Sequence, residues 1–183
     1  MIERGEACCF TGHRPGKLAY GADETHPDCL RLKAAMAGQL CRLAEAGVRE
    51  FIAGMALGTD LWFAESVLAL RARRPQVRLV AAIPHPGQER RWSAVSRARY
   101  QGIVVRADEV HVLCPFYVQG CMQMRNRYMV DRAGHLLAVY EGGAGGTKYT
   151  IDYARRNGLT VTLLRANGET WDHFGVRPVP DRV

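Results

Sequence analysis

The order of apolar and polar positions along the chain predicts alternating strands and helices. Six short apolar runs have the length of buried strands and are bounded by residues that break regular structure. They cover residues 7–11, 50–53, 77–83, 109–114, 135–140 and 159–164. Strands that alternate with helices through short turns are typical of a parallel sheet covered on both sides. We therefore predict an α/β, Rossmann-like fold with a mainly parallel sheet of about six strands and helices on both faces.

The segments between these strands are predicted to be helices. Residues 27–46 carry Leu30, Leu32, Met36 and Leu40 on what is expected to be one apolar side, mostly at three- and four-residue spacing. Further helices are expected after the glycine loops that follow the second and fifth strands. Two more are predicted at residues 88–101, which are polar, and at residues 122–133, where Met124, Tyr128 and Met129 are expected to face the core.

The length of 183 residues fits one domain. We predict a single domain over residues 1–165 and a C-terminal extension over residues 166–183. No apolar run approaches the roughly 20 residues that a membrane-spanning helix needs, and the first residues lack the pattern of a signal peptide. The expected location is the cytoplasm, with no membrane partner.

Six cysteines raise the question of disulfides or a metal site. Cys8, Cys9, Cys41 and Cys114 lie in apolar stretches, which favours free buried thiols. No C-x-x-C pair occurs, so zinc ligands would have to come from scattered positions. We predict no metal site.

The formal net charge of +7 favours an anionic partner. A phosphorylated small molecule and a nucleic acid both satisfy this condition. The basic residues are spread along the chain, so most of them are expected to belong to a solvated surface. The charge alone leaves both classes of partner open.

Three of the predicted strand ends lead into glycine loops. In parallel sheets of this kind, ligands bind beyond the carboxyl ends of strands, where successive connections pass to opposite faces. The loops at residue 12, residues 54–58 and residues 142–146 can meet above one such crevice. We take this edge of the sheet as the candidate site.

The loop at residues 141–147 gives the strongest single signal. Its closely spaced glycines let backbone N–H groups approach an anion, and the following helix adds the partial positive charge of its N-terminus. A phosphate group fits this pattern. The alternative is a tight turn in which Thr147 serves only as an N-cap. Neither the Walker A motif nor the G-x-G-x-x-G fingerprint is present.

Polar side chains beside these loops have two interpretations each. Arg14 either binds a phosphate or carboxylate or makes an ordinary salt bridge with a loop acid. For His13 a structural hydrogen bond is favoured over contact with a ligand. Asp60 either caps the following helix or accepts hydrogen bonds from a ribose hydroxyl. Arg125, Asn126 and Arg127 either contact an anion or lie on a solvated helix face.

The chain offers no convincing set of catalytic residues. We find no Ser-His-Asp, Cys-His or paired-carboxylate arrangement. Trp62 and Trp92 are able to stack on a base, but tryptophans more often fill a core. Catalytic residues are therefore not assigned.

Five stretches, in the same order, resemble the SLOG superfamily and specifically its YpsA-like branch. They are T-G-H-R-P at residues 11–15, G-M-A-L-G-T-D-L-W-F-A-E at 54–65, the strand at 107–114, G-C-M-Q-M-R-N-R-Y-M-V-D at 120–131 and E-G-G-A-G-G-T-K-Y-T-I-D-Y-A at 141–154. The likeness spans almost all of residues 7–165. It implies a Rossmann-like domain that recognises nucleotides or nucleotide-derived ligands, with some relatives linked to bacterial cell division or stress responses.

Two more distant branches imply rival functions. The Lonely Guy enzymes hydrolyse nucleoside monophosphates and use a P-G-G-x-G-T-x-x-E loop whose glutamate is catalytic. Here Thr150 stands at the place of that glutamate, so a carboxylate would have to come from elsewhere, such as Glu65 or Glu141. The DNA-processing protein A family has similar first and second loops and binds single-stranded DNA, but no stripe of interleaved aromatic and basic residues is evident here.

The loops and the resemblance together define the candidate ligand-binding residues. These are Thr11, Gly12, His13, Arg14, Gly54, Met55, Ala56, Gly58, Asp60, Arg125, Asn126, Glu141, Gly142, Gly143, Gly145, Gly146 and Thr147. We predict a binding or sensor protein for a nucleotide or an NAD or ADP-ribose derivative, with no required cofactor. A nucleotide N-glycosidase is the alternative, and a single-stranded DNA binder is third. Weak nucleic-acid binding and a homo-oligomer remain open.

Overall fold

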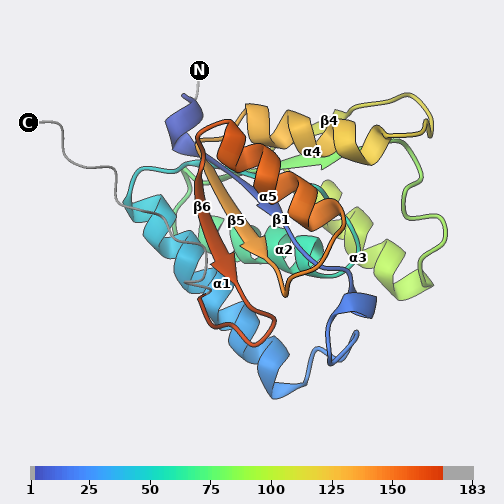
Figure 1. The fold of residues 1–183 in the computed structure, drawn as a ribbon, viewed down its shortest axis with the longest axis horizontal. Coiled ribbons are helices and arrows are strands. Elements are labelled where there is room, and N and C mark those ends of the chain that lie inside the picture. The colour runs from blue at the N-terminus through green and yellow to red at the C-terminus, as the bar shows by residue number, and fades with distance from the viewer. Residues whose placement is uncertain (1–2, 171–183) are drawn as a thin grey trace, which may run out of the picture.

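A six-stranded sheet lies between two layers of helices (Figure 1). The computed structural model describes residues 3–170. The strand order is β4-β3-β2-β1-β5-β6, and every neighbouring pair is parallel. The strands are β1 (Ala7–Thr11), β2 (Glu50–Ala53), β3 (Arg78–Ile83), β4 (Glu109–Val112), β5 (His135–Val139) and β6 (Thr160–Leu164). The predicted α/β, Rossmann-like fold is confirmed.

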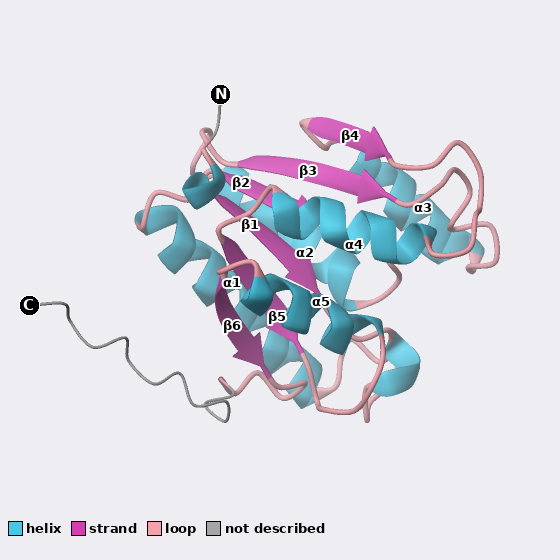
Figure 2. Cartoon of the chain, turned by 45° about the horizontal axis from the view of Figure 1, so that its top comes forward, coloured by secondary structure: helices cyan, strands magenta, loops and turns pink. Residues whose placement is uncertain are grey.

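Five α-helices and two short 3-10 turns connect these strands in the described residues. They are η1 (Arg4–Glu6), η2 (Pro15–Lys17), α1 (Pro27–Glu45), α2 (Thr59–Arg71), α3 (Ala94–Val104), α4 (Cys121–Asp131) and α5 (Gly146–Arg156). Helices α4 and α5 cover one face of the sheet, and α1, α2 and α3 cover the other (Figure 2). Because the chain changes sides after β4, the connections diverge between β1 and β5.

Both faces of the central strands are apolar because both are covered by helices. In β1, successive side chains point to opposite faces, so Phe10 packs in the core under α1 to α3 and Cys9 packs in the core under α4 and α5. All five residues of β1 are buried. This explains why the strands appear in the sequence as continuous apolar runs.

Helix α1 illustrates how a four-residue spacing selects the buried side. Leu32, Met36 and Leu40 are fully buried against the sheet. Leu30 is 55% exposed, so its predicted place on the apolar side is wrong. Cys41 is also exposed, against the prediction of a buried thiol, because it lies about 100° around the helix from Leu40. The other three cysteines of that prediction are buried.

Helix α3 begins later than the sequence suggests. The polar segment at residues 88–101 was predicted to be helical throughout, but α3 starts at Ala94. The Ser93 side chain accepts a hydrogen bond from the Ser96 backbone N–H at 3.1 Å and so caps the helix. The residues before Ser93 form turns instead.

Two further predictions about the α4 side of the sheet need correction. Strand β4 ends at Val112, two residues before the predicted end, and Pro115 follows shortly afterwards. In α4, Met129 is buried as predicted, but Met124 is 50% exposed. The five residues that separate these methionines turn the helix by about 500°, which leaves Met124 roughly 140° away from Met129.

The end of the described chain returns toward the sheet. Leu164 and Thr170 form an isolated antiparallel bridge after the turn that follows β6. Residues 171–183, most of the predicted C-terminal extension, lie outside the described residues. Among the helices of residues 3–170, none combines the length and the apolar character needed to cross a membrane.

Candidate functional site

A cavity of about 350 Å³ opens at the carboxyl ends of the central strands. Its volume lies within the range of small-molecule sites, roughly 300–1,000 Å³. The end of β1 and its loop, the loop after β2, and the N-terminal parts of α4 and α5 supply its walls. The lining residues are Phe10, Thr11, Gly12, His13, Arg14, Gly16, Lys17, Ala56, Asp60, Met122, Arg125, Asn126, Met129, Gly146 and Thr147.

The three glycine loops meet at this edge, as the sequence suggested. Thr59 Oγ1 donates a hydrogen bond to the His13 carbonyl oxygen at 2.9 Å, which joins the second loop to the first. Thr147 Oγ1 donates to the Gly12 carbonyl oxygen at 3.2 Å, and the Glu141 backbone N–H donates to His13 Nε2 at 3.0 Å. These bonds hold the first loop between the other two.

Two glycines allow this close approach. A Cβ atom at Gly12 would collide with Thr59 Oγ1, the group that binds the first loop. Gly58 has a φ of +99°, and a Cβ atom there would lie 2.6 Å from Pro15 Cδ. A side chain at either position would therefore push the first two loops apart.

The inner wall of the cavity holds a buried pair of opposite charges. Arg125 Nη1 lies 3.8 Å from Asp60 Oδ2, and both side chains are less than one-tenth exposed. Burial raises the pKa of Asp60, while the Arg125 charge and the Ala56 N–H oppose that shift. Burial lowers the pKa of Arg125, and the Asp60 carboxylate opposes this. Each group therefore makes the charged form of the other less costly.

Hydrogen bonds fix the Arg125 guanidinium against the strand ends. Its Nε donates to Asn126 Oδ1 at 2.8 Å, and its Nη1 donates to the Gly54 carbonyl oxygen. The Asp60 carboxylate accepts a hydrogen bond from the Ala56 N–H at 3.1 Å. The interpretation as a solvated helix face is wrong for Arg125 and Asn126, which are buried, whereas Arg127 is exposed.

Two further cations lie at the mouth of the cavity. Arg14 and Lys17 are both exposed and line the cavity from the loop after β1. The Lys17 ammonium donates to the Ala144 carbonyl oxygen at 3.3 Å. Within residues 3–170 the Arg14 guanidinium makes no hydrogen bond or ion pair, so the predicted alternative of a salt bridge to a loop acid is wrong there.

His13 has a structural role in this geometry. Burial lowers its pKa, the Lys17 charge lowers it further, and the Glu141 carboxylate opposes the shift. This shift favours the neutral ring, whose Nε2 accepts the Glu141 backbone N–H. The favoured interpretation, a structural hydrogen bond, is confirmed, and the ring still forms part of the cavity wall.

Helix α5 begins within the fifth-strand loop. Gly145, with a φ of +141°, is its N-cap, so Thr147 lies inside the first turn and is not the cap. Gly146 and Thr147 line the cavity, whereas Gly142, Gly143 and Gly145 lie outside its lining. The cavity therefore meets the start of the helix rather than the whole glycine loop.

The cavity gathers ten of the seventeen candidate residues. The other seven lie outside its lining: Gly54, Met55, Gly58, Glu141, Gly142, Gly143 and Gly145. Five lining residues were missed: Phe10, Gly16, Lys17, Met122 and Met129. Lys17 could have been predicted, because it is a basic residue in the same loop as Arg14, three positions later. The methionines gave no local signal, because their position depends on how α4 packs over the sheet.

The carboxylates that were considered for hydrolysis lie away from the cavity. Glu65 pairs with Arg99 at 2.5 Å on the α1 to α3 side of the sheet. Glu141 is exposed and accepts a hydrogen bond from the Ala166 backbone N–H. Thr150 is fully buried, and its hydroxyl donates to the Gly146 carbonyl oxygen. Asp60 is the carboxylate that lines the cavity among the described residues.

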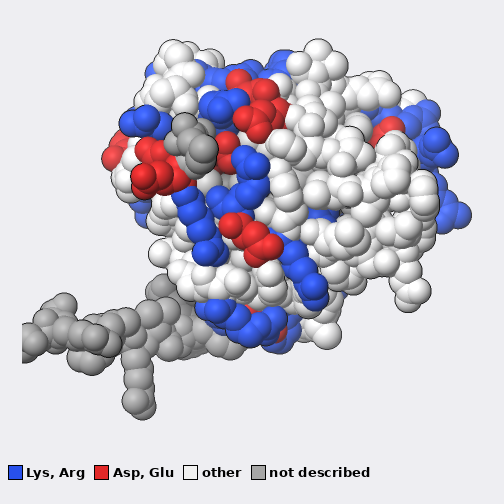
Figure 3. Space-filling view, turned by 90° about the horizontal axis from the view of Figure 1, so that it is seen from above, with Lys and Arg blue, Asp and Glu red and all other residues white. Residues whose placement is uncertain are grey.

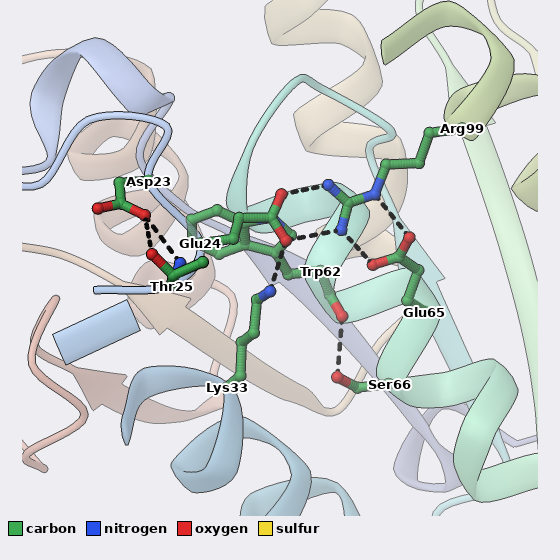
Figure 4. Close-up of polar contacts among 8 residues, drawn as sticks. All are labelled: Asp23, Glu24, Thr25, Lys33, Trp62, Glu65, Ser66 and Arg99. Carbon is green, nitrogen blue, oxygen red and sulfur yellow. Dashed lines mark hydrogen bonds and ion pairs between the residues drawn. The ribbon is translucent and has the colours of Figure 1, made fainter. Parts of the chain in front are cut away.

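Arg14 and Lys17 lie in the long connection between β1 and α1. An ion-pair network at Glu24, near the end of this connection, holds it against the helices. Glu24 accepts hydrogen bonds from Lys33 on α1 and from Arg99 on α3, and Arg99 also binds Glu65 on α2 (Figure 4). These side chains are about one-third exposed. The network therefore ties the long β1–α1 connection to three helices.

Neither tryptophan considered for base stacking lines the cavity. Trp62 is buried in the core, and Trp92 packs edge-on against Tyr100. No group of three His, Cys, Asp or Glu side chains within residues 3–170 is arranged to hold a metal ion.

Comparison with known proteins assigns the sequence pattern to a family. A family model described as the YspA SLOG family matches residues 8–164. A UPF0398 protein from Halalkalibacterium halodurans is 31% identical over 150 residues, which cover 80% of this chain and 79% of the relative. A UPF0398 protein from Bacillus pumilus is 30% identical over 174 residues, which cover 90% and 92%.

Two solved structures share the fold at low sequence identity. DNA processing protein A from Streptococcus pneumoniae matches with a TM-score of 0.58 and 14% identity, over 87% of this chain and 50% of that chain. Its counterpart from Helicobacter pylori, described for its single-stranded DNA binding mode, matches with a TM-score of 0.58 and 16% identity. The match covers 86% of this chain and 64% of that one.

Proposed function

Because this chain belongs to the YspA SLOG family, we propose that its cavity binds a nucleotide or a nucleotide-derived anion. The observation that carries this proposal is the charge of the cavity wall. Arg14, Lys17 and Arg125 bring three positive charges to it, and Asp60 brings one negative charge. An anionic ligand balances this excess.

The parts of such a ligand correspond to different parts of the wall. A phosphate group contacts Arg14 and Lys17 at the mouth, near the N-terminus of α5 at Gly146. Asp60 is the acceptor for a sugar hydroxyl. Phe10, Met122 and Met129 supply apolar surface for a ring.

A combined binding and hydrolysis assay tests this proposal. The purified protein is incubated with adenine and guanine nucleotides, NAD and ADP-ribose, and both the melting temperature and the release of free base are followed. We expect at least one member of the panel to raise the melting temperature without release of base. Absence of any shift across the panel would remove the support for a nucleotide ligand.

A nucleotide N-glycosidase is the second candidate. The observation in its favour is Asp60, a carboxylate in the cavity whose pKa is raised by burial, as general acids and bases often require. Against it, the Asp60 carboxylate is already bound by Arg125 and the Ala56 N–H. Release of free base from a nucleoside monophosphate, lost in Asp60→Asn, would favour this candidate.

Single-stranded DNA binding is the third candidate. The net charge of +7 and the shared fold with DNA processing protein A support it. The cavity has the volume of a small-molecule site, which favours the nucleotide proposal. DNA titration at several salt concentrations distinguishes the two.

A further inference from the structure

Strand β4 is the outer edge of the sheet beyond β3 (Figure 2). In the described part of the chain it pairs with β3 alone, so its other side presents backbone N–H and C=O groups that no strand has taken up. Such edges accept a further strand unless charged or bulged residues block them. The exposed side chains of β4 are Val110 and Val112, which do not block pairing.

Most of the exposed large apolar side chains lie in the part of the chain that includes β4. Among the described residues, eight large apolar side chains are exposed, and seven of them lie between residues 95 and 124, on α3 and its C-cap, β4, the loop after β4 and the first half of α4. These seven are Val95, Val105, Val110, Val112, Phe116, Tyr117 and Met124. In the view from above, charged side chains gather on one side and at the margins, and a broad area between them carries neither Lys, Arg, Asp nor Glu (Figure 3). Exposed apolar side chains on and near an unpaired edge strand are one mark of an interaction site.

The backbone of β4 alternates between its two sides. The Leu113 N–H donates to the carbonyl oxygen of Ile83, whose register partner is Val112, so Leu113 and, two and four residues earlier, His111 and Glu109 direct their backbone groups toward β3. Val110 and Val112 therefore direct theirs toward the open edge. These two residues are the ones that a new strand would bind.

We propose that the β4 edge pairs with β4 of a second copy of this chain, antiparallel, about a two-fold axis at Val110. In this register Glu109 of each chain lies directly opposite His111 of the other as a non-hydrogen-bonded pair, and the two Val110 residues exchange both backbone hydrogen bonds. The two Val110 residues face each other at the axis. The sheets of the two copies then join into one continuous sheet.

Charge complementarity selects both the partner and the register. Glu109 already accepts a bond from His111 on its own strand at 2.9 Å, so the two side chains lie on the same face of the sheet. Pairing about Val110 places an acid opposite a histidine on both sides of the axis. Pairing about His111 would instead place two histidines opposite each other. A second copy thus supplies matching backbone, charge and apolar side chains at once.

The oligomeric state of the full chain tests this proposal. Sedimentation velocity between 1 and 100 μM is expected to show a dimer for the wild type. Val110→Lys places two ammonium groups together at the axis and should raise the dimer dissociation constant at least tenfold. Leu30→Lys, an exposed apolar position on α1, is the matched control and should stay dimeric. A monomeric wild type, or a folded Val110→Lys variant that stays dimeric, would overturn the proposal.

A cysteine experiment tests the register. Cys41, the exposed native thiol of the described residues, is first replaced by serine. In a hydrogen-bonded antiparallel pair, as at Val110, the facing Cα atoms are about 5.5 Å apart, within reach of a disulfide. Val110→Cys should therefore form a covalent dimer on mild oxidation. Val112→Cys faces Asp108 of the other copy and should not. Equal cross-linking of both variants, or of Val112→Cys alone, would refute the register.

Discussion

Arg125 and Asp60 form a buried ion pair in the wall of the cavity, with 3.8 Å between Arg125 Nη1 and Asp60 Oδ2. The two residues are 65 positions apart in the sequence, Arg125 on α4 and Asp60 on α2. They meet only because both helices begin at the same edge of the sheet. The pair therefore couples the geometry of the cavity to the stability of the fold.

Removal of the Asp60 carboxylate should destabilise the protein strongly. Asp60→Ala leaves the Arg125 charge buried without its partner, and we expect the free energy of unfolding to fall by about 3 kcal/mol. The matched control is Asp152→Ala, which breaks an exposed pair with Lys148 on α5 and should cost less than about 1 kcal/mol. Urea denaturation at pH 7 measures both. Similar losses for the two variants would contradict a special role for the buried pair.

Arg14→Ala should weaken the binding of a nucleotide without unfolding the protein. The side chain is exposed and contributes no core packing, but a charge-assisted hydrogen bond to phosphate is worth about 1.5–3 kcal/mol. We expect the dissociation constant to rise roughly tenfold or more in calorimetric titration. Arg73→Ala removes the same charge at an exposed position outside the cavity and should bind normally. Unchanged affinity in folded Arg14→Ala would exclude Arg14 from the site.

Bulk at Gly146 should block the cavity without straining the backbone. A Cβ atom at Gly146 would meet no other atom within 4 Å, and Gly146 lines the cavity, so valine extends into free space there. A ligand at about 100 times its dissociation constant stabilises the protein by roughly 2.7 kcal/mol, a shift of about 5–10 °C in melting temperature. We expect Gly146→Val to lose this shift.

The control for that experiment is Gly102→Val on α3. Gly102 has equally open surroundings but lies away from the cavity, so its variant should keep the full ligand-induced shift. A wild-type shift in folded Gly146→Val would mean that the ligand binds elsewhere.

The Glu24 network should make stability depend on pH in the acid range. Burial raises the pKa of Glu24, but hydrogen bonds from Arg99 and Lys33 outweigh this and lower it from 4.5 to about 2. A carboxyl group with a lowered pKa in the folded state contributes stability above pH 4.5, and this contribution is lost as the pH falls toward 2. We expect Glu24→Gln to lower the free energy of unfolding by about 1 kcal/mol at pH 7.

The difference between wild type and Glu24→Gln should shrink below pH 4.5, as measured by chemical denaturation at pH 7 and pH 3. Glu45→Gln, which breaks a more exposed pair with Arg74, is the control and should change stability less at pH 7. A Glu24→Gln difference that stays the same at both pH values would contradict this assignment.

Any binding of single-stranded DNA should be weak and sensitive to salt. Contacts between dispersed basic side chains and phosphates release counterions, so affinity should fall about tenfold or more between 50 and 200 mM salt, with little sequence preference. Fluorescence anisotropy with two unrelated oligonucleotides measures both properties. Tight binding that survives high salt would favour the nucleic-acid function over the nucleotide site.

The local sequence by itself determined the fold class and the edge of the sheet where the loops meet. Apolar runs and glycine positions are local signals, because strand alternation and helix periodicity are properties of neighbouring residues. They predicted the six strands and the meeting of the loops at Gly12, Gly58 and Gly146. They misplaced the start of α3, because the Ser93 cap outweighs the polar pattern before it.

Only the tertiary structure decided which side chains form the cavity and which surfaces stay uncovered. From the sequence, Arg125 was as consistent with a solvent-exposed position as with a place in the site. In the structure, α4 packs against the strand ends and buries Arg125 beside Asp60. The same packing places Met122 and Met129 in the cavity wall. The strand order, which the sequence does not show, places β4 at the edge of the sheet. Burial and pairing depend on elements that are distant along the chain, so no local pattern encodes them.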